Sequence, residues 1–246
     1  MKATTLASSQ CVPGHSLEGE QTHEGISVWN RRNVLLGLTG RWHGAADWKD
    51  ITIDLGFVLS NDGVNFREPA HEWTFLPRGA DGAWDQGGLL QGQGFENIGD
   101  ETFIYYGAWD PRNRQSNPAR GGVGIAVLSR DRFGDLVVET AGRGPGDYQL
   151  PEITSEFVTA AVPVPPAPRF YLNATGLGPE AALKIELLAA DETPLPGYSA
   201  LVRQNGFQTP IRWTDGTAAL PKRIHVRVGF VGPRNTDIRF SALYLR

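Results

Sequence analysis

Residues 55–62, Leu55-Gly56-Phe57-Val58-Leu59-Ser60-Asn61-Asp62, recur 69 residues later as residues 124–131, Gly124-Ile125-Ala126-Val127-Leu128-Ser129-Arg130-Asp131. Each copy is a short apolar run that ends in Ser-x-Asp, which is typical of a strand followed by a tight turn. The same shift aligns Val34-Leu35-Leu36 with Phe103-Ile104-Tyr105. The repeat therefore predicts two units of one β architecture, with Asp62 and Asp131 capping the turns.

Each unit is predicted to hold four short antiparallel strands. The first three strands of unit one are expected at residues 24–29, 33–38 and 51–60, and those of unit two at residues 87–95, around Ile104 and at residues 124–129. The short outer strands are expected at residues 64–67 and 136–139. Four antiparallel strands per repeat are typical of a β-propeller blade, and a repetitive β-sandwich is the alternative.

The composition favours an all-β protein. Among 246 residues there are 30 glycines, 17 prolines and seven tryptophans, which suit many turns and aromatic-rich strands. The net charge is −4 and no basic stripe accompanies the aromatic residues, so a nucleic-acid binder is excluded. A single cysteine, Cys11, excludes an internal disulfide. The first twenty residues hold no apolar run of a signal peptide or membrane span, so we expect a cytoplasmic protein without membrane contact.

The character of the chain changes near residue 155. Four prolines interrupt the stretch 163–168, and strands then resume with clean alternation at residues 224–230 and 238–244. Further strands are expected at residues 169–173, 183–189, 201–203 and 211–213. We therefore expect an irregular segment at 1–21, propeller blades at 22–154 and a β-sandwich at 155–246.

Two carboxylates stand at positions suited to chemistry. Glu24 lies between His23 and Gly25 at the start of an alternating strand, and Asp85 lies in the glycine-rich bend of residues 82–88, ahead of an inner strand. Side chains at such positions face the channel of a propeller. A solvated turn residue is the alternative for Glu24, and a side chain that closes its own turn is the alternative for Asp85.

Several of these stretches resemble the five-bladed propeller glycoside hydrolases of families 43 and 32. His23-Glu24-Gly25 is similar to the Glu-Gly motif of the family's general acid, and residues 60–69 resemble its blade-closing segment. Gly92-Gln93-Gly94-Phe95 resembles the next inner strand, where many members have Gly-His-Gly, and residues 185–213 resemble the family's C-terminal sandwich. The resemblance implies a partial propeller of about two to three blades, truncated at its N-terminus relative to the family.

The resemblance implies cleavage of furanoside or pyranoside bonds by paired carboxylates, with Glu24 as the acid and Asp85 as the other candidate. The family's nucleophile is not identifiable, so we expect a poor catalyst. A non-catalytic carbohydrate-binding protein is the main alternative, and a protein-interaction propeller is the weaker one.

Gln93 replaces the usual histidine, so neither a metal nor another cofactor is expected. An open propeller edge predicts self-association. The residues expected to contact sugar are His23, Trp42, His43, Gln93, Trp109, Asp110 and Arg112, although blade packing is the alternative for Trp42 and Trp109.

Overall fold

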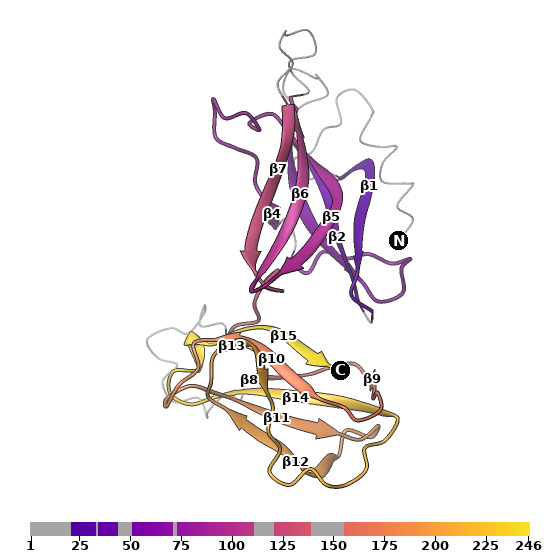
Figure 1. Ribbon diagram of the computed structural model, residues 1–246, viewed down its shortest axis with the longest axis vertical. Coiled ribbons are helices and arrows are strands. Elements are labelled where there is room, and N and C mark those ends of the chain that lie inside the picture. Colours follow the sequence, from indigo (N-terminus) through magenta and orange to yellow (C-terminus); the bar gives the residue numbers. More distant parts are fainter. Residues whose placement is uncertain (1–20, 33, 44–50, 71–72, 111–120, 139–154) are drawn as a thin grey trace, which may run out of the picture. The chain divides into compact units, whose positions relative to one another are not determined.

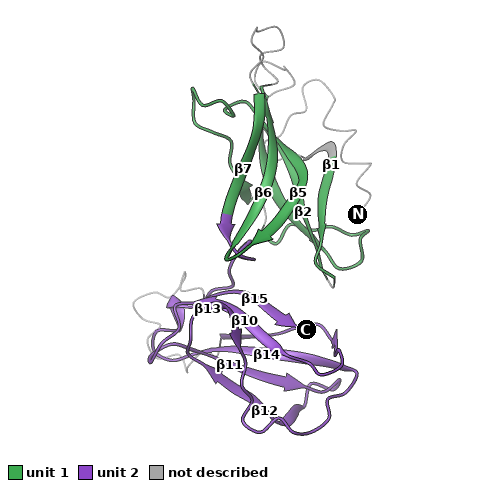
Figure 2. Ribbon diagram, in the orientation of Figure 1, with its two compact units in different colours: residues 1–127 green, residues 128–246 purple. Residues whose placement is uncertain are grey.

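The computed structural model describes residues 21–32, 34–43, 51–70, 73–110, 121–138 and 155–246, without the side chains of residues 21–24. Within these ranges the regular structure is extended, apart from one 3-10 turn at Asn235–Asp237, so the all-β prediction is confirmed. None of the helical structure in these ranges is long and apolar enough to cross a membrane. The chain divides into two compact units, residues 1–127 and 128–246 (Figure 2). The domain boundary expected near residue 155 stays a prediction.

Unit 1 begins with a four-stranded antiparallel sheet (Figure 1). Its strands, in spatial order, are β1 (Gln21–Asn30), β2 (Leu35–His43), β3 (Thr52–Ser60) and β4 (Thr74–Leu76). The strands β2 and β3 pair without interruption from Leu35↔Ser60 to His43↔Thr52. The pairing of β1 with β2 is irregular between Gln21 and Ile26, which marks a bulge in β1 at residues 22–25.

The second sheet of unit 1 contains β5 (Leu89–Ile98), β6 (Glu101–Trp109) and β7 (Gly121–Ser129) in that order. The two copies of the 69-residue repeat lie at equivalent places, because β3 and β7 are each the third strand of their sheet. The aligned segments at Leu35 and Ile104 likewise fall on the two second strands, β2 and β6. The repeat in the sequence is therefore a repeat of strand order.

Both expected outer strands are wrong. Residues 64–67 make only one bridge to β3, at Leu59↔Arg67, and the fourth strand is β4 instead. Pro69 has no amide proton to extend the bridge, whereas Phe75 of β4 stacks on Phe57 at 5.1 Å and so anchors the later segment. Leu136 pairs with Phe240 of unit 2 through two backbone hydrogen bonds of 2.8 and 3.1 Å, so it adds no fourth strand to the second sheet.

Strand β5 holds the two sheets of unit 1 together. The rings of Trp29 and Phe95 stack with centroids 5.5 Å apart, and the Gln93 amide donates to the Ser27 hydroxyl at 3.2 Å. Apolar residues of both sheets have no exposed surface: Leu38, Ile53, Leu55, Leu89 and Ile104. Unit 1 thus has a buried apolar core of its own.

Unit 2 encloses a core between a sheet of order β13-β10-β15 and a sheet of order β12-β11-β14-β8, with β9 added beside β14 (Figure 1). Alternation in β14 buries Ile224, Val226, Val228 and Phe230 as expected. The expected strand at 211–213 is wrong; β13 ends at Pro210, and Trp213 instead packs edge-on against Phe170 and Tyr198. The strands are β8 (Ser155–Val158), β9 (Val162–Pro163), β10 (Phe170–Thr175), β11 (Ala182–Leu188), β12 (Pro194–Val202), β13 (Gly206–Pro210), β14 (Arg223–Val231) and β15 (Arg239–Leu245).

The two Ser-x-Asp turns differ. Asp62 caps its turn as expected, because its Oδ1 accepts the amide protons of Val64 and Asn65 at 2.9 and 2.8 Å. Hydrogen bonds from the Asn65 side chain and from these amides lower the pKa of Asp62 below its usual value. Asp131 has a left-handed backbone (φ 59°) and is buried, and its carboxylate accepts the hydroxyl proton of Tyr244 at 2.8 Å. The second aspartate therefore connects its turn to β15.

Candidate functional site

Polar side chains gather at one end of unit 1, where β2 and β6 finish and β3 and β5 begin. The backbone joins these strand ends: the Ile53 amide donates to Gly87 at 3.2 Å, and the Trp109 amide donates to Gly88 at 2.9 Å. We call this region the polar end and define it by Arg41, His43, Asp54, Arg78, Trp84, Asp85, Tyr106 and Asp110. It is the candidate site.

Asp54 accepts hydrogen bonds from several groups of the polar end. Its Oδ1 accepts the backbone amide of Arg78 at 2.6 Å, and its Oδ2 accepts the Arg78 guanidinium at 2.9 Å. His43 Nε2 lies 2.8 Å from the same Oδ2. Burial by itself would raise the pKa of Asp54, but these hydrogen bonds and the nearby positive charge outweigh burial and hold the pKa below its usual value. Asp54 is therefore ionised at neutral pH.

Asp85 is held against an aromatic pair. The Tyr106 hydroxyl donates to Asp85 Oδ2 at 3.1 Å, and the Tyr106 ring stacks on the Trp84 indole with centroids 6.0 Å apart. The indole is 46% exposed, which is unusual for such a large apolar side chain. Burial first, and then the hydrogen bond and charge of Asp85, raise the pKa of Tyr106 above 10, so its hydroxyl stays protonated as a donor.

The glycine-rich sequence around Asp85 permits close approach. A Cβ at Gly79 would stand 2.1 Å from Asp85 Oδ1, and a Cβ at Gly87 would stand 2.6 Å from Asp110 Cα. Only glycine fits at either place without a backbone shift. Asp110 follows β6 directly and is 6% exposed, whereas Asp85 is half-buried. Asp85 is therefore the more accessible carboxylate of the two.

The residues expected from the sequence fall into three groups. His43, Asp85 and Asp110 lie at the polar end, as does Trp109 through its backbone. Trp42 lies on the face of β2 that carries Leu38, and Gln93 is bonded to Ser27, away from this cluster. The backbone of His23 and Glu24 lies in the irregular stretch of β1 between Gln21↔Arg41 and Ile26↔Thr39; their side chains, and all of Arg112, lie outside the described residues.

Sequence reasoning missed five residues of the polar end: Arg41, Asp54, Arg78, Trp84 and Tyr106. One signal was available for Asp54, which interrupts the apolar run of β3 between Ile53 and Leu55. A charged residue in a buried strand is rarely fully buried unless it is paired. Arg78 lies 24 residues further along and carries no comparable signal.

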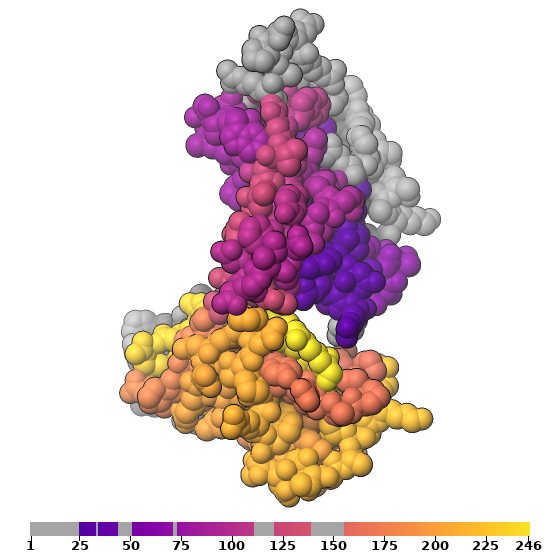
Figure 3. Space-filling view, viewed as in Figure 1, coloured from indigo at the N-terminus to yellow at the C-terminus, as the bar shows by residue number. Residues whose placement is uncertain are grey.

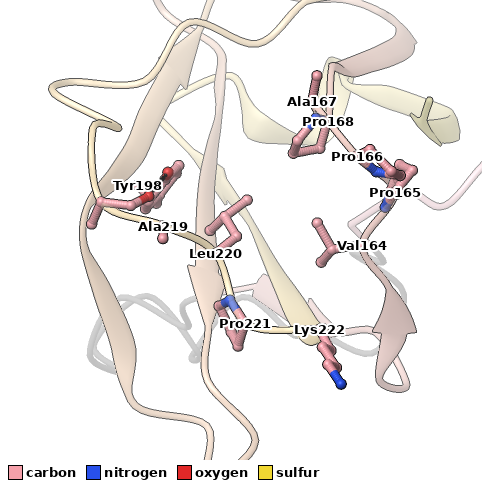
Figure 4. A pocket seen from close by; sticks show the side chains of 11 residues that line it. Val164, Pro165, Pro166, Ala167, Pro168, Tyr198, Ala219, Leu220, Pro221 and Lys222 are labelled. Atoms are coloured by element: carbon pink, nitrogen blue, oxygen red, sulfur yellow. Dashed lines mark hydrogen bonds between the residues drawn. The ribbon is translucent and has the colours of Figure 1, made fainter.

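In the described parts of the chain, two hollows lie away from the polar end, and one of them, of about 190 Å³, is lined by the polar turn residues Ser60, Asn61, Asp62, Asn65 and Arg67 together with Phe66. No group of three or more His, Cys, Asp or Glu side chains there could hold an ion, and the expectation of no metal remains a prediction. A groove of about 470 Å³ in unit 2 is lined by prolines, alanines, Val164, Leu220, Tyr198 and Lys222 (Figure 4). The Tyr198 hydroxyl donates to the Ala218 carbonyl, and Lys222 points away from the groove. The groove therefore offers few polar groups to orient a sugar.

No protein-family model and no curated protein matches this chain. Among solved structures, an arabinoxylan arabinofuranohydrolase of glycoside hydrolase family 43 from Bacillus subtilis, in complex with cellotetraose, aligns with 89% of the chain at 13% identity and a TM-score of 0.27. Another, a glycoside hydrolase, aligns with 96% at 11% identity and a TM-score of 0.24. The chain spans 53% and 62% of these two proteins. At such TM-scores neither likeness supports a conclusion about this chain.

Proposed function

We propose that the polar end of unit 1 binds a saccharide, with Trp84 as the stacking surface and Asp85 as a hydrogen-bond acceptor. The observation that carries the proposal is the exposed indole stacked on Tyr106, whose hydroxyl is bonded to Asp85. An aromatic face with a few fixed polar groups suits a ligand that has apolar ring faces and outward hydroxyls. Tyr106 keeps both Trp84 and Asp85 in position.

We also propose that unit 1 consists of propeller blades and unit 2 of a β-sandwich. The repeated strand order of the two sheets in unit 1 supports the first assignment. The common core of the two sheets in unit 2 supports the second. Under this proposal, the glycoside hydrolase-like motifs at residues 23–25, 60–69 and 92–95 fall within a partial propeller, and the one at residues 185–213 falls within the sandwich.

Saccharide binding is tested by titrating neutral oligosaccharides in a calorimeter. Trp84→Ala is expected to weaken binding at least about tenfold, a change of about 1.4 kcal/mol. Trp29→Ala is the matched control, because Trp29 also stacks on an aromatic ring in unit 1 but lies toward the other end of β1. If Trp84→Ala binds as the wild type does, the site is wrong; if no neutral saccharide binds the wild type, the proposed function is wrong.

Glycoside hydrolysis is the second candidate function. One observation favours it: the backbone of Glu24 lies opposite the end of β2, in the irregular stretch of β1, and so at the end of unit 1 that holds Asp85. Hydrolysis needs two carboxyl groups about 5 to 9.5 Å apart. Asp54 is a poor acid, since its low pKa keeps it ionised.

Because the opposing carboxylate is not identified, we expect no cleavage of nitrophenyl arabinofuranosides or xylosides, nor of fructans, above background. Cleavage that is lost in both Glu24→Gln and Asp85→Asn would contradict this expectation and establish the pair. The matched control is Asp81→Asn, because Asp81 is an exposed aspartate of the loop that precedes Asp85.

A further inference from the structure

Strand β7 carries two glycines on the face that meets the aromatic pair of the polar end. A Cβ added at Gly122 would stand 3.0 Å from Cζ3 and 3.2 Å from Cε3 of Trp84, and one added at Gly124 would stand 2.3 Å from Cζ of Tyr106. Residues two apart on a strand point to the same face of the sheet. Both rings therefore lie against one face of β7, at positions where the lack of a side chain makes room for them.

The two rings are offset along the strand rather than superposed. Strand residues two apart are separated by about 6.4–6.8 Å, and the ring centroids are 6.0 Å apart with the ring planes at 20°. Each ring also lies against its own glycine. Trp84 and Tyr106 therefore form one aromatic surface that is two rings long and follows β7, and we call it the aromatic platform.

The aromatic platform is accessible and has a polar margin. Trp84 is 46% exposed, Tyr106 is half-buried, and the Tyr106 hydroxyl is fixed by its hydrogen bond to Asp85 at 3.1 Å. Because side chains alternate along a strand, the exposed β-branched residues of β7 lie on its other face, away from the rings. The platform therefore presents apolar ring faces along its length and a carboxylate beside Tyr106.

We propose that the ligand of the polar end is a linear oligosaccharide that lies along β7, with one sugar ring on Trp84 and the next on Tyr106. This inference rests on the proposed saccharide site and specifies the length of its ligand. A pyranose stacks on an aromatic ring through its apolar face, so a monosaccharide covers one ring of the platform and a disaccharide covers both. Gly122 and Gly124 are then positioning residues, because they hold the two rings in line.

The first test uses the wild-type chain and ligands of increasing length. Glucose is compared with cellobiose and cellotriose, and xylose with xylobiose and xylotriose, by calorimetry. In a series that binds, the disaccharide is expected to bind at least about tenfold more tightly than the monosaccharide, and the trisaccharide to add a smaller gain. Equal affinity of monosaccharide and disaccharide would overturn the inference and leave the proposed function intact, whereas no binding in either series would overturn the proposed function and the inference with it.

The second test moves the rings without removing them. Gly122→Ala and Gly124→Ala each displace one ring of the platform, so the advantage of the disaccharide over the monosaccharide is expected to fall below about threefold in both variants. Gly107→Ala is the matched control on the neighbouring strand β6. Its added Cβ would stand 3.6 Å from the Cβ of Leu90, which is an ordinary contact, so the full advantage is expected to remain.

The emission of the Trp84 indole separates positioning from stability. The difference between the emission spectra of the wild type and of Trp84→Phe isolates this indole. The disaccharide is expected to shift its emission in Gly107→Ala as in the wild type, but not in Gly122→Ala. A disaccharide advantage that persists in both Gly122→Ala and Gly124→Ala would overturn the role of β7. Should these variants fail to fold, the wild-type comparison of monosaccharide and disaccharide still decides the length of the ligand.

Discussion

At the scale of single residues, two buried charges of the polar end contrast. Asp54 is 6% exposed and surrounded by donors, whereas Arg41 is 2% exposed and has two nitrogens without partners. A buried ion with full hydrogen bonding stabilises a fold or is neutral to it, and one without it destabilises the fold. Hydrogen bonds therefore compensate the burial of the Asp54 charge, whereas two nitrogens of Arg41 lack this compensation.

Replacing Asp54 is expected to lower stability at neutral pH but not in acid. Because the folded-state pKa lies below the ordinary 3.8, the carboxylate contributes stability above that value, and the contribution is lost as pH falls through the folded pKa. Asp54→Asn should cost about 1–3 kcal/mol at pH 7. Urea unfolding at neutral and at acid pH measures the difference in the free energy of unfolding between the wild type and Asp54→Asn.

The exposed Asp81 provides the control, since Asp81→Asn should change stability by less than about 0.5 kcal/mol. A loss in Asp54→Asn that is as large in acid as at neutral pH would contradict the role of the charge.

The Tyr106–Asp85 hydrogen bond can be observed by titration. The pKa of the Tyr106 hydroxyl is raised above 10 by burial and by Asp85, so Asp85→Asn should bring it down toward 10. The resonance of the ring carbon that carries the hydroxyl, assigned by comparison with Tyr106→Phe, reports the ionisation. An unchanged Tyr106 titration in Asp85→Asn would show that the carboxylate is not its acceptor.

At the scale of elements, β7 is the exposed edge of its sheet. Its alternation leaves three β-branched side chains in solvent: Val123 is 79% exposed, Ile125 52% and Val127 50%. The strand forms part of the visible surface of unit 1 (Figure 3). An apolar edge strand is a template for pairing with another chain, which supports the expected self-association.

A charge on β7 is expected to reduce that association. Ile125→Lys places a charge on the exposed row without removing a core residue, so the folded chain should shift toward monomer. Light scattering coupled to size exclusion, over a range of concentrations, measures the shift. The control is Leu201→Lys, because Leu201 on β12 is 53% exposed; an equal effect of both variants would argue against β7 as the contact.

At the scale of the whole molecule, the two compact units have separate buried cores. In unit 2 the apolar residues of both sheets form one cluster, and Leu183 in it has no exposed surface. Separate cores permit separate unfolding, so a single free energy of unfolding does not describe the chain.

Leu183→Ala leaves a cavity in the packed core of unit 2, so it is expected to lower the free energy of unfolding of that unit by about 2–5 kcal/mol. We expect two thermal transitions, of which only one should move to a lower midpoint temperature. Scanning calorimetry resolves the transitions. Leu201→Ala, on the strand next to Leu183, is the control and should leave both in place. A single transition that moves as a whole would contradict independent unfolding.

The sequence by itself determined the elements whose signal is local. Alternation of apolar and polar residues with a period of two identified β14 and its buried face, because the side chains of consecutive strand residues point to opposite faces of the sheet. The 69-residue repeat identified β3 and β7 as equivalent strands. The Asn61-Asp62-Gly63 turn could also be predicted from the sequence, since Asp62 accepts hydrogen bonds from amides only two and three residues away.

Only the tertiary structure decided which strands pair at the edges and which charges meet. Residues 64–67 and 136–138 have strand-like sequences, yet β4 is the fourth strand beside β3, and Leu136 pairs with Phe240 of β15. Arg78 reaches Asp54 across 24 residues, and Arg41 lies opposite Asp54 without bonding to it. Pairings between distant residues depend on the packing of the whole unit, because the free energy that selects them comes from burial and hydrogen bonding in three dimensions.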